Sequence, residues 1–379
     1  MAIACGHFDR NECRSCVLLP QAYAEQQASK LALCHGLLDA LGDWHWLPSV
    51  PSPLGGFRNK AKMAVSGTSK APILGIIAAD GSGTDLSDCA LYPPAMQACF
   101  APLAHFIGVA NIAPYDIATR HGELKYLLLS MAASGEWMLR FVLRSREALG
   151  RIRKHLPSLR EALPQLRVVS VNLLPEHKAV LEGDQEILLS AESDLAMPLN
   201  DVPLYLRPRG FFQTNSVVAA ALYAQVRDWC AAIAPPSVLD LFCGVGGFAL
   251  HCADGVREVT GIETSADAIA CAQRSAREMG LAHTTFHSTD ALAFASKQPL
   301  DAALVIVNPP RRGLGAALCN DLQRSNARWL IYSSCNAQTL VHDLQRLSEF
   351  IPREVRLFDM FPHTRHFEVA TLLERRGHG

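Results

Sequence analysis

The fold is decided by one stretch, Val238-Leu239-Asp240-Leu241-Phe242-Cys243-Gly244-Val245-Gly246-Gly247. It is an apolar strand that runs directly into a glycine-rich turn, after which a helix is expected. Such a turn lets the backbone approach a nucleotide-type ligand closely. A second strand, Val259-Thr260-Gly261-Ile262-Glu263, ends in a carboxylate. This acid lies about 20 residues beyond the turn, where it can accept both hydroxyls of a ribose.

The order of strand, turn, helix, strand and acid predicts a doubly wound α/β domain of Rossmann-like type with an adenosine-containing cofactor. NAD is disfavoured, because Ala249 stands where G-x-G-x-x-G requires its third glycine. We therefore expect Phe242 and Gly244 in the turn and Glu263 after the second strand to contact the cofactor. Asp290, at the end of a third unit, is a candidate partner for the adenine amine.

Three motifs near the end of the chain supply reactive groups. They are Asn308-Pro309-Pro310-Arg311-Arg312 after a buried strand, Ser333-Ser334-Cys335-Asn336 after another, and Phe361-Pro362-His363-Thr364 ahead of Glu368. Ligands bind at the carboxyl ends of the strands in such a sheet. A thiol, a carboxylate and an adenosine-binding loop there suit methyl transfer to a carbon that must first be activated covalently.

The order of these motifs resembles that of the uracil-C5 RNA methyltransferases, which use S-adenosylmethionine. The resemblance covers residues 5–373. It implies that the Cys335 thiolate adds to C6 of a uracil, that C5 then takes the methyl group, and that Glu368 removes the C5 proton. The alternative bases are His363 and His366, which could instead shape the loop. A cysteine taken alone is more often a small buried hydrophobe.

Two further segments are interpreted with the resemblance. Gln213, in Phe211-Phe212-Gln213-Thr214-Asn215, is expected over the cofactor, although this segment equally fits an N-cap turn before a helix that begins at Ser216. In amino-methyltransferases an aromatic residue follows the two prolines and stacks on the target base. Arg311 stands there in this chain, which favours a ring carbon as the methyl acceptor and assigns Asn308 to the cofactor site.

Length and composition limit the class of protein. The chain has 379 residues, so we expect two or three domains; its 49% hydrophobic and 19% charged content suits a soluble globular protein. The sequence contains no apolar run of the roughly 20 residues that a membrane span needs, and its first residues form no hydrophobic signal core. We expect a cytoplasmic protein. With a net charge of −1, nucleic-acid binding requires a local basic patch.

Four of the twelve cysteines form a pattern, with Cys5, Cys13 and Cys16 spaced C-x7-C-x2-C and Cys89 downstream. Four soft thiolates suit zinc or an iron–sulfur cluster, and spacing alone does not separate these two from each other or from scattered structural thiols. The resemblance favours a [4Fe-4S] cluster, because family members carry this arrangement. The spacing differs from the C-x3-C-x2-C of radical S-adenosylmethionine enzymes.

Basic residues gather in the first half of the chain and could neutralise phosphates. They are Arg58, Lys60, Lys62, Arg120, Lys125, Arg140, Arg144, Arg146, Arg151, Arg153 and Lys154. The segment Phe57-Arg58-Asn59-Lys60-Ala61-Lys62 is the better candidate, since an aromatic ring beside cations can stack on a base. A solvated helix face explains the 146–154 run equally well.

The expected organisation is a cysteine-cluster segment at 1–92, a central α/β RNA-binding domain at 93–205 that is expected to form one unit with it, and a methyltransferase domain at 206–379. We expect a helix at 21–41, strands at 124–129, 137–143 and 168–174, and a closing hairpin of 355–358 with 369–373. The early Cys5 leaves no room for the OB-like barrel of some relatives, and the tRNA-specific relatives lack the cysteine set. The resemblance thus implies a specific uridine of 23S ribosomal RNA as substrate and a monomeric enzyme that binds neither DNA nor membrane.

Two other classes of function stay open. A cytosine-C5 RNA methyltransferase would share the cofactor and the thiol, but would need an acid to hold N3 and the amine of the cytosine. A cluster-dependent RNA-binding protein would bind RNA and leave it unmethylated.

Overall fold

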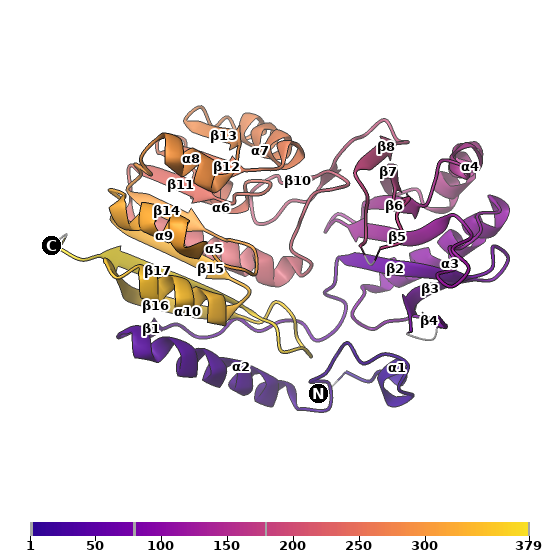
Figure 1. The fold of residues 1–379 in the computed structure, drawn as a ribbon, viewed down its shortest axis with the longest axis horizontal. Helices are drawn as coiled ribbons and strands as arrows, with labels where there is room; N and C mark the ends of the chain where they lie inside the picture. Colours follow the sequence, from indigo (N-terminus) through magenta and orange to yellow (C-terminus); the bar gives the residue numbers. More distant parts are fainter. Residues whose placement is uncertain (1–2, 79–80, 179, 378–379) are drawn as a thin grey trace.

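The molecule has two lobes, each built around its own β-sheet (Figure 1). The computed structural model describes residues 3–78, 81–178 and 180–377. In this part of the chain, none of the helices combines the length and the apolar character that crossing a bilayer requires.

The central lobe contains a seven-stranded sheet in the order β4-β3-β2-β5-β6-β7-β8. Its strands are β2 (Lys60–Gly67), β3 (Pro72–Ile77), β4 (Gly83–Asp85), β5 (Leu124–Met131), β6 (Trp137–Leu143), β7 (Leu166–Leu173) and β8 (Gln185–Leu188). Only the β6–β7 pair is parallel, because α4 (Leu149–Ala162) provides the crossover between them. With α3 (Pro94–Val109), α4 buries the apolar side chains of this sheet. The strands expected at 124–129, 137–143 and 168–174 are confirmed as β5, β6 and β7.

The second lobe contains an eight-stranded sheet in the order β1-β16-β17-β15-β14-β11-β12-β13. Its strands are β1 (His45–Trp46), β11 (Ser237–Leu241), β12 (Glu258–Glu263), β13 (Thr284–Ser288), β14 (Leu304–Val307), β15 (Trp329–Ser334), β16 (Phe350–Phe358) and β17 (Glu368–Arg375). Strand β17 runs antiparallel to both β15 and β16, which confirms the expected closing hairpin. The other pairs are parallel, as a doubly wound fold requires.

Helices cover both faces of this sheet, because its strands alternate apolar side chains between two buried layers. One layer holds α5 (Ser216–Ile233), α6 (Gly247–Cys252) and α7 (Ala266–Glu278). The other holds α2 (Tyr23–Leu38), α8 (Ala291–Lys297), α9 (Gly315–Arg324) and α10 (Ala337–Arg346). The sequence of β14 shows the alternation, since Leu304 and Ile306 enter one layer while Val305 and Val307 enter the other.

Short elements complete the chain. They are α1 (Gly6–Asp9), the 3-10 turn η1 (Asp39–Leu41) and a two-stranded sheet of β9 (Leu195–Ala196) with β10 (Tyr205–Leu206). Helix α5 begins at Ser216 after the N-cap Asn215, whose side chain accepts a hydrogen bond from the Val218 amide. The N-cap interpretation of the 211–215 segment is therefore confirmed.

The first 92 residues do not form one unit with the central lobe alone. The chain starts beside that lobe at α1, crosses to the second lobe as α2 and β1, and returns as β2 (Figure 1). Strand β1 pairs with β16, and α2 packs in the layer of α10. The expected 1–92 segment is thus divided between the lobes, because the apolar side chains of Cys34 and Leu38 fit the second lobe's core.

Candidate active site

Cys335 directly follows β15 at the carboxyl edge of the second sheet, as its position after a buried strand predicts. Its side chain is half-buried. Burial raises the pKa of the Cys335 thiol, and the nearby Glu368 carboxylate raises it further. The positive charge of the nearby Arg311 guanidinium opposes this shift. Arg311 therefore favours the thiolate, the form that acts as a nucleophile.

Glu368 is the first residue of β17, which pairs with β15 in antiparallel fashion. Its side chain is buried, and burial raises its pKa to about 7. The Ser333 hydroxyl donates a 2.7 Å hydrogen bond to Glu368 Oε1, which opposes the rise. A carboxylate whose pKa lies near 7 is suited to act as a general base at neutral pH. The structure thus brings the two predicted catalytic residues onto neighbouring strands.

Two loops at this edge are joined beside Cys335. The Asn336 side chain caps α10 and also donates a 3.1 Å hydrogen bond from Nδ2 to the Arg311 carbonyl. Thr339 Oγ1 donates to the same carbonyl at 3.2 Å. Asn308 is half-buried at the end of β14. The loop that begins at Asn308 is therefore fixed against the loop that carries the thiol.

The glycine-rich turn has the backbone that a ligand-binding loop needs. Phe242, Gly244 and Gly246 all have positive φ, at 71°, 54° and 86°. A Cβ atom built on Gly244 would meet nothing within 4 Å, so the backbone there faces open space. The strain of a non-glycine residue at positive φ often marks a functional loop. Phe242 and Gly244 thus line a place where a ligand can approach the backbone.

Glu263 is the last residue of β12 and Asp290 follows the neighbouring β13, and each uses one carboxylate oxygen in a turn or cap. Glu263 Oε1 accepts hydrogen bonds from Thr264 Oγ1 at 2.8 Å and from the Ser265 amide at 2.9 Å. Asp290 Oδ1 caps α8 by accepting from two amides. The second oxygen of each carboxylate has no hydrogen-bond partner among the described residues. It is therefore available to a ligand.

Gln213 lies where the two lobes meet. Its side chain is buried, and its carbonyl accepts a 2.9 Å hydrogen bond from Asn59 Nδ2. The Asn59 side chain also donates to Ser216 Oγ. The backbone of Arg58 forms an isolated antiparallel β-bridge with Asn215. The 57–62 and 211–215 segments, whose contact could not be predicted from the sequence, thus touch each other directly.

Two expectations about RNA-contacting residues are wrong. Phe57 is buried, so its ring is not available to stack on a base. Arg140 is 3% exposed and donates to the carboxylates of Glu182 and Glu186 at 2.6 to 3.0 Å. Its charge is neutralised inside the lobe, so it does not belong to a phosphate-binding stripe. Helix α4, with most of the 146–154 run, lies at the end of the central lobe that is far from the second lobe (Figure 1). This position fits the interpretation of the run as a solvated helix face.

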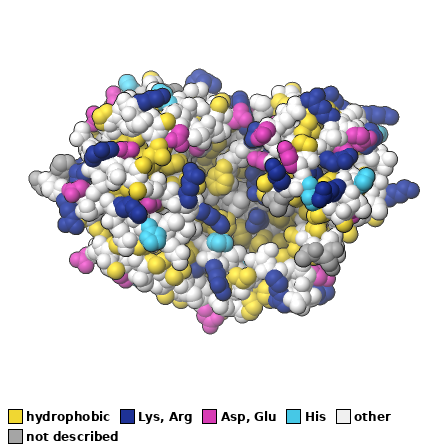
Figure 2. Space-filling model, viewed as in Figure 1, with side chains coloured by type: hydrophobic (Ala, Val, Ile, Leu, Met, Phe, Trp, Pro, Cys, Tyr) yellow, Lys and Arg dark blue, Asp and Glu magenta, His cyan; other side chains and the backbone are white. Residues whose placement is uncertain are grey.

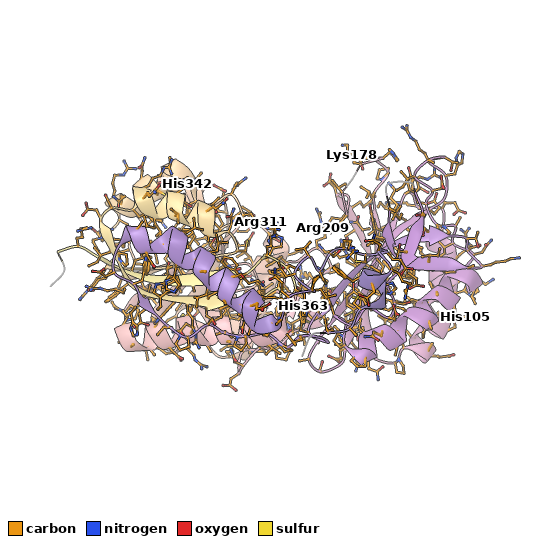
Figure 3. All side chains as sticks on the ribbon, turned by 90° about the horizontal axis from the view of Figure 1, so that it is seen from below. His105, Lys178, Arg209, Arg311, His342 and His363 are labelled. Atoms are coloured by element: carbon orange, nitrogen blue, oxygen red, sulfur yellow. The ribbon has the colours of Figure 1, made fainter. Side chains whose placement is uncertain are left out.

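A hollow separates the two lobes on the face seen in Figure 2, and Lys and Arg side chains border it. Figure 3 shows Arg311 on the second lobe and Arg209 at the other side of the notch, with Lys178 at the rim of the central lobe. Phe211, next to Arg209 in the 207–215 loop, is 72% exposed. Of these cations, Arg311 lies near Cys335. A wide cavity of about 1010 Å³ beside β11–β13 contains none of the predicted site residues.

Cys5, Cys13, Cys16 and Cys89 line one cavity of about 180 Å³ together with Arg58 and Tyr92. Burial and then the neighbouring Cys89, Cys13 and Cys5 raise the pKa of Cys16 to about 12. The four thiols are therefore close enough to interact. Among the described residues, no three or more His, Cys, Asp or Glu side chains are arranged to hold a metal ion.

The two histidines weighed against Glu368 differ in their surroundings. His363 is buried, and its two ring nitrogens bond to the Gln26 side chain and the Leu54 carbonyl. These contacts favour the loop-shaping role for it. His366 is more exposed, and burial followed by the Arg311 charge lowers its pKa.

Sequence reasoning missed Asp240, in the middle of β11. Its side chain is fully buried, Oδ2 accepts a 3.0 Å hydrogen bond from the Ala249 amide, and Oδ1 has no partner in the described structure. Burial raises its pKa to about 8. A charged residue within an apolar strand is the signal that could have drawn attention to it.

Comparisons with known proteins identify the family of this chain. Residues 197–376 match the family model described as tRNA (Uracil-5-)-methyltransferase. A 23S rRNA (uracil(747)-C(5))-methyltransferase RlmC from Edwardsiella ictaluri is 50% identical over 372 residues, covering 98% of this chain and 99% of that protein. The corresponding protein of Pectobacterium carotovorum is also 50% identical, with the same coverage. The chain belongs to the RNA uracil-C5 methyltransferase family.

A solved structure extends this conclusion to the fold. The tRNA (uracil-54, C5)-methyltransferase of Pyrococcus abyssi, in complex with S-adenosyl-L-homocysteine, is 25% identical with a TM-score of 0.77. It matches 95% of this chain, and this chain covers 85% of it. The second lobe therefore has the fold of the S-adenosylmethionine-dependent methyltransferases in the RNA uracil-C5 methyltransferase family.

Proposed function

We propose that this chain transfers a methyl group from S-adenosylmethionine to C5 of a uridine in 23S ribosomal RNA, with uridine 747 as the target. The observation that carries the proposal is the placement of Cys335 beside Arg311 and the buried Glu368 at one sheet edge. The target is supported by relatives of nearly full length that are named for it. We further propose that the protein acts as a monomer in the cytoplasm and on neither DNA nor membranes.

The reaction proceeds through a covalent bond between enzyme and RNA. The Cys335 thiolate forms a C–S bond at C6 of the uracil, and the C5=C6 electron pair moves to C5 and O4. C5 then takes the methyl group, while the sulfonium sulfur keeps the electrons of the broken bond. Glu368 removes the C5 proton, and that electron pair restores C5=C6 as the C6–S bond breaks. The uracil leaves methylated, and Cys335 is again a thiolate.

S-adenosylmethionine supplies the electrophilic methyl group when bound, and the residues around the glycine-rich turn suit it. Glu263 has one free carboxylate oxygen for the ribose hydroxyls, and the open backbone at Gly244 admits the ligand. Asp290 has a free oxygen for the adenine amine. Gln213, Phe242 and Asn308 complete the set of cofactor contacts that we propose.

We also propose that Cys5, Cys13, Cys16 and Cys89 hold a [4Fe-4S] cluster. Four thiols around one cavity supply the ligand set of such a cluster. Each cysteine would bind a different iron, so the four sulfurs need not converge as they would on a single ion. The cavity is also lined by Arg58, which pairs with Asn215 where the two lobes meet. We assign the cluster a structural or RNA-contacting role.

The test separates nucleophile from base. Cys335→Ala cannot add to C6, so it should yield neither methylated RNA nor an adduct that survives denaturation. Glu368→Gln keeps addition and methyl transfer, while proton removal slows by roughly 10²–10⁴-fold, the usual worth of a positioned base. The variant should therefore accumulate joined to methylated RNA, and a denaturing gel should show a retarded band that depends on S-adenosylmethionine.

Two controls make the result decisive. RNA with cytidine in place of the target uridine should give no band, which excludes a cytosine-C5 enzyme. A normal turnover of Glu368→Gln, or trapping by His366→Ala instead, would show that the base has been assigned to the wrong residue.

A further inference from the structure

The loop between β16 and β17 leads directly into Glu368, yet strand pairing does not hold it. Pairing ends at Phe358 and Glu368, which leaves residues 359–367 outside the hairpin. We call this segment the catalytic loop. Arg311, beside Cys335, acts on the pKa of His366, so the loop lies next to the reacting groups. Something other than the sheet must therefore fix its position.

His363, at the middle of the catalytic loop, is bound entirely by the N-terminal segment. Its amide donates to Gln26 Oε1 at 2.8 Å, and its carbonyl accepts from the Leu18 amide at 2.9 Å. Its Nδ1 faces Gln26 Nε2 at 3.4 Å, and its Nε2 faces the Leu54 carbonyl at 2.9 Å. The contact with the Leu54 carbonyl requires the proton on Nε2. Figure 3 shows His363 beside the end of α2.

Gln26 is the centre of this contact. Its side chain is 1% exposed on α2; Oε1 accepts from the His363 amide, and Nε2 donates to the carbonyls of Leu18 and Gln21 at 3.0 Å. One turn further along the helix, Lys30 Nζ donates to Asp359 Oδ1 at 2.6 Å and to the Phe361 carbonyl at 3.0 Å. Both ends of this ion pair are buried. Two buried side chains of α2 thus hold the catalytic loop at three of its residues.

The backbone of His363 shows that the loop depends on these contacts. Its φ is +64°, a left-handed conformation that is unfavourable for a residue with a Cβ atom. Such strain persists only where the surroundings impose it. The Leu18 amide lies two residues beyond Cys16, and the Leu19 amide donates to the Cys16 carbonyl at 3.0 Å. The same contact therefore ties the catalytic loop to the cysteine segment.

We propose that Gln26 is a positioning residue, which holds the catalytic loop through His363 and joins it to the N-terminal cysteine segment. The inference rests on the proposed function, because the value of a fixed loop is that it borders Cys335 and leads into Glu368. Displacement of the catalytic loop by about 1 Å can lower the rate of such a reaction by roughly 100-fold. The cofactor site lies on other loops, so cofactor binding should not change.

The experiment compares Gln26→Ala with Gln27→Ala, a neighbouring glutamine on the same helix that is more exposed. In Gln26→Ala, amide hydrogen exchange over residues 359–368 should become faster. The turnover number should fall by roughly 10–100-fold at an unchanged S-adenosylmethionine affinity. Gln27→Ala should match the wild type within about twofold in every measurement, as expected for a surface substitution.

A second pair of variants leaves α2 intact. Asparagine tolerates the left-handed conformation and its Oδ1 can face Gln26 Nε2, so His363→Asn should keep more turnover than His363→Val, whose branched side chain does not. The proposal fails if Gln26→Ala leaves the loop amides as protected as in the wild type, or if the loop loosens while turnover stays normal. Hydrogen exchange does not depend on the chemistry. A loosened loop with reduced turnover, but no trapped adduct in Glu368→Gln, would support the anchor and refute only the assignment of the base.

Discussion

Glu368, the proposed catalytic base, illustrates how an environment suited to a base comes at the expense of stability. Its predicted position after the Phe361-Pro362-His363-Thr364 motif is where the structure has it, on the strand next to Cys335. Its burial and the Ser333 contact could not be predicted, because both depend on which strands become neighbours. The raised pKa that makes Glu368 a suitable base also means that its charged form is unfavourable in the folded protein.

The raised pKa of Glu368 predicts the direction in which the free energy of unfolding changes with pH. The pKa of Glu368 is raised in the folded state from 4.5 to about 7, so folding favours the protonated acid. Both states are protonated at low pH, and stability is lost as the pH rises from about 4.5 to 7, by up to about 3 kcal/mol. Glu368→Gln removes this loss. Chemical denaturation should find it up to about 3 kcal/mol more stable than the wild type at pH 8, and nearly equal to it near pH 4.5.

The comparison between pH values is the control, because a general effect of the substitution would be the same at both. Activity of the wild type should rise with pH through about 7, since the base must be ionised. An equal stability difference at both pH values would contradict the assigned environment of Glu368.

At the scale of elements, local sequence patterns predicted where strands and helices begin and end, but not which elements pack beside each other. Strand β6 has the bounds expected from its apolar run, and helix α5 begins at the residue that its N-cap indicates. The partner of Arg140 on β6 could not be predicted, because Glu186 lies on β8 at the sheet edge. Glu186 also accepts from Ser170 and Asn172 on β7. A side chain that looked like a phosphate ligand instead joins three strands.

Arg140→Ala should therefore affect stability and spare RNA binding. Removing one partner of a buried charge network costs about 3–5 kcal/mol, because the carboxylates lose their counterion. Denaturant unfolding measures this loss. The matched variant is Lys62→Ala on β2, whose side chain is exposed; if it contacts phosphate, the salt dependence of RNA binding should fall by about one unit. A reduced salt dependence in Arg140→Ala would return it to the RNA-contacting set.

At the scale of the whole molecule, the two lobes are joined more closely than the sequence indicated. The motifs of the second lobe predicted its sheet and the carboxyl edge that carries the site, since strand and loop order is local information. Residues 23–46 gave no such indication, because nothing in an amphipathic helix and a two-residue strand specifies which sheet they join. Their place was decided by pairing with β16, over 300 residues away.

The cluster proposal is tested on the whole protein. Purified without oxygen, it should be brown and contain about four iron atoms per chain, the content of one [4Fe-4S] cluster. Metal analysis measures this directly, and a variant with Cys16→Ser should lose most of the iron. Cys99, which is buried on α3 and does not line the cysteine cavity, provides the control substitution Cys99→Ser. Stoichiometric zinc without iron would refute the cluster.

The crossing of the N-terminal segment to the second lobe also determines when this segment can dock during translation. Trp46 cannot meet Val355 until nearly the whole chain has left the ribosome. At roughly 5–20 residues per second, the intervening segment takes on the order of 15–60 seconds to make. Throughout that interval α2 has no partner, while the early cysteines already lie outside the ribosome. Docking of the nascent chain's first helix against its last hairpin is thus a late event, and it brings the N-terminal segment and the catalytic loop together in the same step.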